Sequence, residues 1–241
     1  MPDAAPMNAE VDHLVIAARS LDEGVQWCEA TLGVVPGPGG THPLMGTHNR
    51  LLALGGPGGD GAFARSYLES LAIEPGKTAA RGEGKHRWFD LDDPSMQAGL
   101  ARHGPRLIHF VARVPDVIAA TQALAHEPTH LDRGEVIEAS RDTPAGRLAW
   151  QITVRDDGQR LFYGALPTLI QWGPVHPIDS MPPSPLRLTA LAATHPRVDT
   201  LEMALARIGL QDTLALQPGA PNLMATFETP RGTVTLESKG L

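Results

Sequence analysis

Short apolar segments bounded by turn residues run through the whole chain and predict a protein rich in β-strands. The first, VDHLVIAAR at residues 11–19, is apolar and β-branched, which is typical of a mostly buried strand. The next segment, SLDEGVQWCEATLG, predicts a helix, because Ser20 can cap its start, acidic residues follow in its first turn and Gly33 marks its end. Pro and Gly then break regular structure in VVPGPGGTHPLMG, apart from one possible short strand around Val34. HNRLLALGG and SYLESLAIE predict two further strands.

This order of elements recurs twice along the chain. RLIHFVARV begins a second round, with a weaker helix around PDVIAATQALAHE and strands at GEVIEASRD, RLAWQITVR and PTLIQWGP. LRLTALAAT begins a third round, with the helix RVDTLEMALARIGL and strands at NLMATFETP and GTVTLES. The strands SYLES and VTLES end in the same three residues. The pattern therefore predicts an α+β protein of three βαβββ units, at residues 10–75, 105–175 and 186–241.

Two polar segments separate these units. Residues 76–104 are polar and predict a crossing segment with one short helix, which starts after Asp93 and stops at Gly104. Residues 174–185, PVHPIDSMPPSP, are dense in proline and predict an extended connector.

Composition narrows the class of protein without naming a function. The formal net charge of −7 argues against nucleic acid as a partner, because phosphate binding needs a basic surface. The single cysteine, Cys28, cannot form an intramolecular disulfide or a thiolate metal cluster. The N-terminal residues show no secretory signal and no apolar run is long enough to cross a membrane, so we expect a cytoplasmic protein without a membrane partner.

The residues of the first two units resemble those of a known group. A His in the first strand of a βαβββ unit, and a Glu in its last strand, are similar to the vicinal oxygen chelate superfamily, which includes glyoxalase I, extradiol dioxygenases and bleomycin-resistance proteins. VDHLVIAARSLDEGVQWCEATLGV, GTHNRLLALG, YLESLAI, RWFDLDD and RLIHFVARVPD resemble the bacterial glyoxalase-like proteins in particular. The resemblance covers residues 10–175 well and the third unit more loosely.

The resemblance implies that two units pair into a curved mixed sheet around a cavity that half encloses a metal. The ligand positions carried over from the superfamily are His13, Glu69, His109 and Gln171. Gln171 departs from the commoner Glu. Such a set suits a divalent first-row metal such as Zn, Fe, Ni or Mn. Glu69 would then be the catalytic base of a lyase or isomerase, or the set would support an oxygenase with iron.

Other residues are candidates for the same cavity. Within THNR, residues 47–50, His48, Asn49 and Arg50 are candidates for substrate binding, since an Arg can hold a carboxylate, although Asn49 also suits a turn. The alternative for His13, Glu69 and His109 is a polar cluster without metal, or one that binds an anion.

Two classes of function remain open at this point. The first is a metal-dependent lyase, isomerase or oxygenase that acts on a small carbonyl or vicinal-oxygen compound. The second is a protein that binds or sequesters a small molecule without chemistry, as bleomycin-resistance proteins do. The third unit either packs on the edge of the sheet or mediates a homodimer, because an unpaired unit would expose a strand edge.

Overall fold

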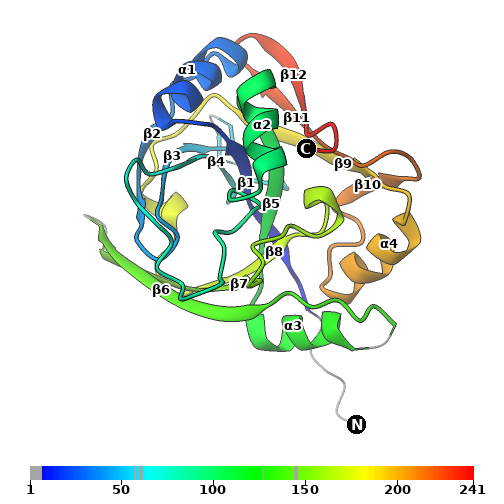
Figure 1. Cartoon of the computed structure of the whole chain (residues 1–241). Coiled ribbons are helices and arrows are strands. Elements are labelled where there is room, and N and C mark those ends of the chain that lie inside the picture. The colour runs from blue at the N-terminus through cyan, green and yellow to red at the C-terminus, as the bar shows by residue number, and fades with distance from the viewer. Residues whose placement is uncertain (1–6, 57, 60–61, 127, 144–145) are drawn as a thin grey trace.

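The computed structural model describes residues 7–241 except 57, 60–61, 127 and 144–145, so the segment examined for a secretory signal lies largely outside the described residues. Its centre is one curled sheet of eight strands in the order β2-β3-β4-β1-β5-β8-β7-β6. Figure 1 shows how strongly this sheet curls. The expected α+β fold with a curved mixed sheet is confirmed.

The first half of the sheet comes from one βαβββ segment. Its elements are β1 (Glu10–Ala17), α1 (Leu21–Leu32), β2 (Gly37–His42), β3 (Thr47–Ala53) and β4 (Tyr67–Ile73). The first and last strands pair in parallel, with Val15 opposite Glu69. As the sequence predicts, Ser20 caps α1 and accepts a hydrogen bond from the backbone of Glu23, and Gly33 ends the helix with φ 74°.

The second half repeats this arrangement. Its elements are β5 (Arg106–Arg113), α3 (Val117–Ala125), β6 (Glu135–Thr143), β7 (Gly146–Val154) and β8 (Thr168–Trp172). β5 pairs with β8 in parallel and with β1 in antiparallel, so the two halves meet at the centre of the sheet. The crossing segment contains α2 (Pro94–His103), and two short 3₁₀ turns are Phe162–Gly164 and Pro177–Ser180.

A third segment forms a separate sheet with a different strand order. Its elements are β9 (Arg187–Thr194), α4 (Val198–Arg207), β10 (Leu214–Gln217), β11 (Asn222–Thr229) and β12 (Gly232–Glu237), and the sheet order is β10-β9-β11-β12. Its last strand, β12, lies at the edge and pairs with β11 rather than with β9. The matching Leu-Glu-Ser of SYLES and VTLES therefore does not mark the same place in the fold. The unit boundaries at 10–75, 105–175 and 186–241 stay a prediction.

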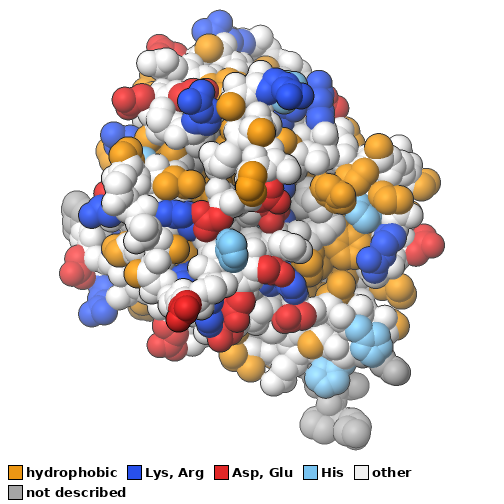
Figure 2. Space-filling model, in the orientation of Figure 1, with side chains coloured by type: hydrophobic (Ala, Val, Ile, Leu, Met, Phe, Trp, Pro, Cys, Tyr) orange, Lys and Arg blue, Asp and Glu red, His pale blue; other side chains and the backbone are white. Residues whose placement is uncertain are grey.

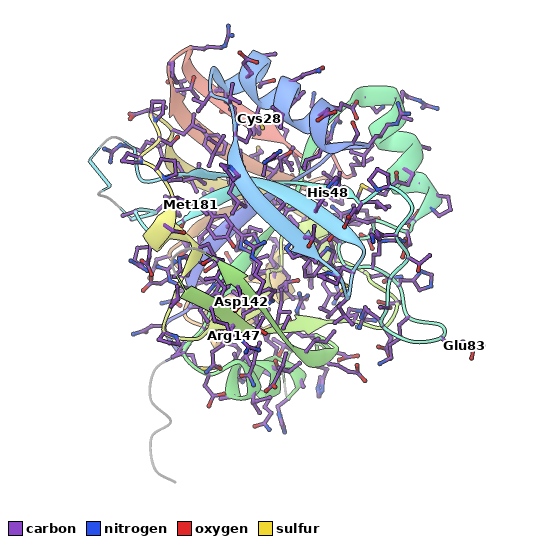
Figure 3. The ribbon with its side chains drawn as sticks, turned by 90° about the vertical axis from the view of Figure 1, so that its left-hand side faces the viewer. Cys28, His48, Glu83, Asp142, Arg147 and Met181 are labelled. Carbon is purple, nitrogen blue, oxygen red and sulfur yellow. The ribbon has the colours of Figure 1, made fainter. Side chains whose placement is uncertain are left out.

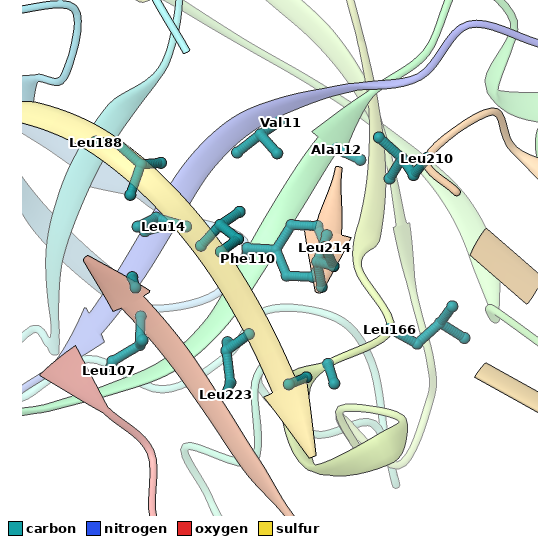
Figure 4. Close-up of a cluster of buried hydrophobic side chains, with 14 of the residues drawn as sticks. Val11, Leu14, Leu107, Phe110, Ala112, Leu166, Leu188, Leu210, Leu214 and Leu223 are labelled. Atoms are coloured by element: carbon teal, nitrogen blue, oxygen red, sulfur yellow. The ribbon is translucent and has the colours of Figure 1, made fainter. Parts of the chain in front are cut away.

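The two faces of the eight-stranded sheet belong to two different cores. On one face, Leu14 and Phe110 pack with side chains of the third segment such as Leu188 and Leu223, as Figure 4 shows. The third segment therefore covers a face of the large sheet, and the expectation that it packs on the edge of the sheet is wrong. The opposite face carries a second core that includes Val15 and surrounds the pocket described below.

The Pro- and Gly-rich stretch before β3 holds a correction. The sequence predicts irregular structure there, with a short strand around Val34, but the structure has β2 at Gly37–His42, an edge strand paired with β3. Glycine is required at this edge, because a Cβ atom at Gly39 would overlap the carbonyl oxygen of Asn49. The residues that look like strand breakers are what lets this strand lie against its neighbours.

The charged side chains on one face of the molecule are of both signs. On the face in Figure 2, Lys and Arg side chains are interspersed with Asp and Glu. Among the described residues, no helix is long and apolar enough to cross a bilayer.

Candidate functional site

A pocket opens on the concave face of the eight-stranded sheet. It is partly open to solvent. Both halves of the sheet contribute to it, together with the crossing segment before α2. Its lining includes the polar residues His13, His42, Asn49, Glu69 and Arg141, and its apolar walls include Trp88, Phe89, Trp150 and Trp172. The four aromatic residues therefore serve both as core and as pocket wall.

An aspartate orients His13 from behind. The pairing of β1 with β5 shifts register between Val11 and His13, so Asp12 and His13 do not alternate across the sheet as neighbours in a regular strand do. Nδ1 of His13 lies 2.7 Å from Oδ1 of Asp12. Oδ2 of Asp12 accepts hydrogen bonds from Nε1 of Trp172 and Nε2 of His176, each at 2.9 Å. Asp12 is fully buried and was not among the residues expected from the sequence.

This network keeps Asp12 ionised. Burial alone would raise the pKa of Asp12, but hydrogen bonds from His13 and His176 outweigh burial and hold this pKa well below its usual range. A carboxylate at this place fixes the hydrogen of His13 on Nδ1 and leaves Nε2 free to accept a proton. The Asp12–His13 pair thus has the arrangement of an oriented general base.

Glu69 faces the free nitrogen of that pair. Oε2 of Glu69 lies 3.6 Å from Nε2 of His13, and the two side chains are nearly buried. Nδ2 of Asn49 donates to Oε1 of Glu69 at 2.5 Å, while Oδ1 of Asn49 accepts from the backbone N–H of Gly40 at 2.7 Å. Because a backbone N–H can only donate, Oδ1 of Asn49 must face Gly40, and its Nδ2 must face Glu69. Asn49 therefore positions the Glu69 carboxylate, and the turn role considered for it does not apply.

His42 is a second imidazole beside Glu69 that the sequence did not single out. Its Nε2 lies 4.0 Å from Oε1 of Glu69, and its Nδ1 lies 3.1 Å from Oγ1 of Thr47. Burial lowers the pKa of His42 to about 4, despite the opposing effect of Glu69. His42 is thus a neutral side chain at neutral pH.

Arg141 brings a positive charge into the pocket from the other half of the sheet. It lies on β6, on the same side of the strand as Ile137, which packs against the core around the pocket. Its Nε and Nη1 atoms are buried and have no hydrogen-bond partner among the described residues. Arg141 was also not expected from the sequence.

His109 lies in a separate polar cluster. Its Nδ1 contacts the carbonyl oxygen of Gly164 at 3.0 Å, and its Nε2 contacts Oγ1 of Thr168 at 3.0 Å and accepts from the backbone N–H of Thr168 at 3.1 Å. The ring of Phe89, which lines the pocket, packs on the His109 ring with centroids 5.0 Å apart. Both nitrogens of His109 are therefore occupied by protein atoms.

Thr168, not Gln171, is the counterpart of Glu69 in the second half of the sheet. Val15 pairs with Glu69 in the first half, and Val111, the equivalent residue two places after His109, pairs with Thr168 in the second. The side chain of Gln171 instead accepts a hydrogen bond from the backbone N–H of Val117, at the start of α3. Gln171 thus lies three residues after the counterpart of Glu69 in strand register, and its role as a ligand position stays a prediction.

His48 and Arg50 do not line the pocket either. Alternation along β3 places Asn49 toward the pocket and its two neighbours on the opposite side of the strand. Arg50 is exposed. Figure 3 labels His48, which is a residue of the same strand, β3. Of the three substrate-binding candidates in THNR, the structure brings Asn49 alone to the pocket.

The metal positions implied by the resemblance do not fit a metal ion here. His13 and Glu69 come together, but His109 is hydrogen-bonded on both nitrogens and Thr168 offers no carboxylate. Burial and the charges of Arg133 and Arg160 lower the pKa of His109 well below its usual value, so its surroundings are cationic and unfavourable to a metal ion. Among the described residues, no group of three or more His, Cys, Asp or Glu is arranged to hold a metal.

The curled sheet of two βαβββ halves with a polar pocket on its concave face defines a glyoxalase-type fold. The sequence model of the glyoxalase-like domain family matches residues 11–209, and the chain belongs to this family. The resemblance to the glyoxalase-like proteins of the vicinal oxygen chelate superfamily is thereby confirmed. No curated protein sequence matches the chain.

One solved structure has a similar fold, and two others were found with lower structural similarity. A hypothetical protein from Staphylococcus aureus is 14% identical over 96% of this chain and 85% of its own, with a TM-score of 0.55. A methylmalonyl-CoA epimerase from Mycobacterium tuberculosis is 16% identical over 74% of this chain and 96% of its own, with a TM-score of 0.38. An epimerase from Streptomyces coelicolor, in complex with 2-nitronate-propionyl-CoA, is 19% identical over 68% and 95%, with a TM-score of 0.35. The likeness to the staphylococcal protein concerns the fold alone.

Proposed function

We propose that this protein is an enzyme of the lyase or isomerase type that moves a proton on a small carbonyl compound bound in the pocket. The observation that supports this most is the facing pair of Glu69 and His13, with Asp12 behind the imidazole. Two proton acceptors that face each other at the wall of a pocket suit general acid–base chemistry. Burying a carboxylate and two imidazoles together is costly, which favours a functional role over simple packing.

The proposed step uses Glu69 as the base. Its carboxylate takes a proton from the carbon next to the substrate carbonyl, the electron pair of the C–H bond moves toward the carbonyl oxygen, and an enolate forms. The proton is then held between Oε2 of Glu69 and Nε2 of His13, where the ionised Asp12 stabilises a positive charge on the imidazole. Return of the proton to the same carbon or to a neighbouring one completes an exchange or an isomerisation.

The apolar walls favour a second candidate function. Trp88, Trp150 and Trp172 line the pocket and offer large surfaces on which a flat small molecule can pack. A protein that sequesters such a molecule would need the walls but not the proton acceptors. Catalytic dependence on Glu69 separates the two functions.

The test is exchange of carbon-bound hydrogen with solvent. The protein is incubated in D₂O with methylglyoxal, dihydroxyacetone, pyruvate or 2-oxobutanoate, and loss of the proton signal next to the carbonyl is followed by NMR. We expect wild-type protein to accelerate exchange for at least one compound, and Glu69→Gln to slow it about 100-fold or more. Glu237→Gln is the matched control, because Glu237 belongs to the other Leu-Glu-Ser and bonds to Asn222 outside the pocket.

Two outcomes would count against catalysis. If none of the four compounds exchanges faster with wild-type protein than with buffer, the isomerase proposal is wrong and the binding function is favoured. If exchange is equally fast in the Glu69→Gln and Glu237→Gln proteins, Glu69 is not the base.

The proposal includes a homodimer. Each end strand of the third sheet, β10 and β12, pairs with one neighbour in that sheet, which leaves edges that another copy can cover. Light scattering at micromolar concentration tests this, and a monomeric mass would contradict it.

A further inference from the structure

Arg141 is a charged side chain whose buried Nε and Nη1 atoms have no hydrogen-bond partner within the part of the chain that the structure describes. Its guanidinium makes no hydrogen bond and no ion pair with any described residue, and Nε and Nη1 are shielded from solvent. An arginine stays charged in proteins and carries five N–H donors. Leaving buried donors of a charged group unused costs free energy, so such a group in a pocket indicates a ligand that supplies acceptors.

The neighbouring carboxylate does not fill this role. Glu69 lines the same pocket as Arg141, yet its close partners are Asn49, His13 and His42, and no ion pair joins Glu69 to Arg141 within 4.0 Å. Asp12 is likewise engaged by His13, Trp172 and His176. Both acidic groups near the pocket are thus satisfied without the guanidinium.

The fold also makes room for the guanidinium. β2 and β6 are the two edge strands of the eight-stranded sheet, and Arg141 of β6 reaches Gly40 of β2. A Cβ atom at Gly40 would overlap Nη1 of Arg141, so the glycine allows the side chain to cross between the two edges. The guanidinium therefore lies beside Gly40, in the half of the sheet that carries Glu69, although Arg141 itself belongs to the other half.

From this arrangement we infer that the ligand of the pocket carries a carboxylate, which Arg141 binds while Glu69 faces the carbon to be deprotonated. This inference rests on the proposed function in one respect, since it names the substrate class as small 2-oxo acids or related carboxylates. Arg–carboxylate hydrogen bonds are strong and directional, so they orient as well as attract the ligand. The apolar walls then contact the rest of the molecule.

Binding is tested separately from catalysis, by isothermal titration calorimetry with pyruvate, acetate, inorganic phosphate and methyl pyruvate. The variant is Arg141→Gln. The matched control is Arg147→Gln, because Arg147 lies on the same β6–β7 hairpin but is exposed and donates to Oγ of Ser140 (Figure 3). Urea unfolding of each variant checks that the fold is retained.

We expect wild-type protein to bind pyruvate more tightly than its methyl ester, which has the same skeleton without the charge. Arg141→Gln should weaken pyruvate binding about 10- to 100-fold and leave the ester unaffected, while Arg147→Gln should match wild type. Equal affinity for pyruvate and its ester, no heat of binding with any carboxylate, or unchanged affinity in Arg141→Gln would overturn the inference. Tighter binding of phosphate than of either carboxylate would overturn the carboxylate assignment too.

The same measurements separate this inference from the proposed function. Arg141-dependent binding of pyruvate, without Glu69-dependent exchange of its methyl protons, would leave a carboxylate-binding protein that is not an isomerase. Glu69-dependent exchange that is equally fast for neutral carbonyl compounds and in Arg141→Gln would leave an isomerase whose substrate needs no carboxylate.

Discussion

Replacement of Asp12 by Asn tests the network that holds His13 in place. Asp12 is fully buried and accepts hydrogen bonds from three donors, on His13, Trp172 and His176. Nδ1 of His176 accepts from the backbone N–H of Ile178, so its Nε2 carries the hydrogen that points at Asp12. An Asn side chain has the shape of an Asp side chain, but it has one acceptor oxygen where the carboxylate has two. Its amide hydrogens would therefore face at least one of the three donors.

The expected loss of unfolding free energy follows from these three hydrogen bonds to Asp12. Breaking a buried, charged hydrogen-bond network by neutralising its acceptor costs about 3–5 kcal/mol of unfolding free energy. Because single domains are stable by about 5–15 kcal/mol, this is a large fraction of the total. We therefore expect Asp12→Asn to fold, with a clearly lower urea midpoint than wild type at pH 7.

The pH dependence has a definite sign. The pKa of Asp12 in the folded protein is held below its unfolded value of 3.8, so folding favours the ionised form. The stabilisation is fully present above the unfolded pKa and is lost as pH falls toward the folded one. The difference between wild type and Asp12→Asn should accordingly stay constant between pH 5 and 8 and shrink below about pH 4.

Urea unfolding at pH 7 and at pH 3.5, followed by tryptophan fluorescence, measures both effects. The exchange assay should show slower proton transfer in Asp12→Asn, because His13 loses its orienting partner. A loss of less than about 1 kcal/mol at pH 7, or a loss that grows as pH falls, would refute this account of the network.

Two further substitutions and one labelling experiment test His109, Gly40 and Cys28. His109→Ala should lower the free energy of unfolding by about 2–4 kcal/mol, because the backbone N–H of Thr168 loses its acceptor and a buried cavity is left. Carboxylate binding should stay intact. A variant of normal stability that no longer binds a carboxylate would show that His109 is a ligand-binding residue instead. Gly40→Ala should weaken pyruvate binding about 10-fold by displacing Arg141, with a small effect on the urea midpoint; unchanged affinity would show that the guanidinium adapts. Cys28 should resist thiol reagents in the native state, because burial raises its pKa to about 12, and rapid labelling of folded protein at pH 8 would contradict this.

Local patterns in the sequence predicted the elements of the fold well. The helix after the first strand has the cap residues that were expected, Ser20 and Gly33, because capping depends on residues that are close in the chain. The sequence match between Leu68-Glu69 and Leu236-Glu237 reflects a shared burial pattern, because both leucines pack in the same core. Alternation says which face a side chain occupies, but it does not say which strand lies next to it, so it could not show that β12 is an edge strand.

The candidate site was predicted in part, and the failures have physical causes. His13 and Glu69 stand out as polar residues in apolar strands, and the register of β1 and β4 brings them together. Gln171 was carried over from the resemblance as the ligand position of the last strand, whereas the pairing of β5 with β8 puts Thr168 at the place that Glu69 has in the first half.

The residues that sequence reasoning missed depend on features that a single sequence does not display. Asp12 joins the site through a shift in strand register, and His42 through a glycine-rich edge strand that looks like a loop. Arg141 did give a signal of the kind that marked Glu69. It is a charged residue that continues the buried side of a strand begun by Ile137.

A crystal structure of the Glu69→Gln protein with pyruvate would show whether Arg141 and Glu69 act on the same bound carboxylate compound. This variant should bind pyruvate, because Arg141 is retained, while it exchanges the methyl protons about 100-fold more slowly. We expect the pyruvate carboxylate within hydrogen-bonding distance of the Arg141 guanidinium and the methyl carbon beside the side chain at position 69. Pyruvate bound outside this pocket, or held there with its methyl carbon turned away from position 69, would contradict it.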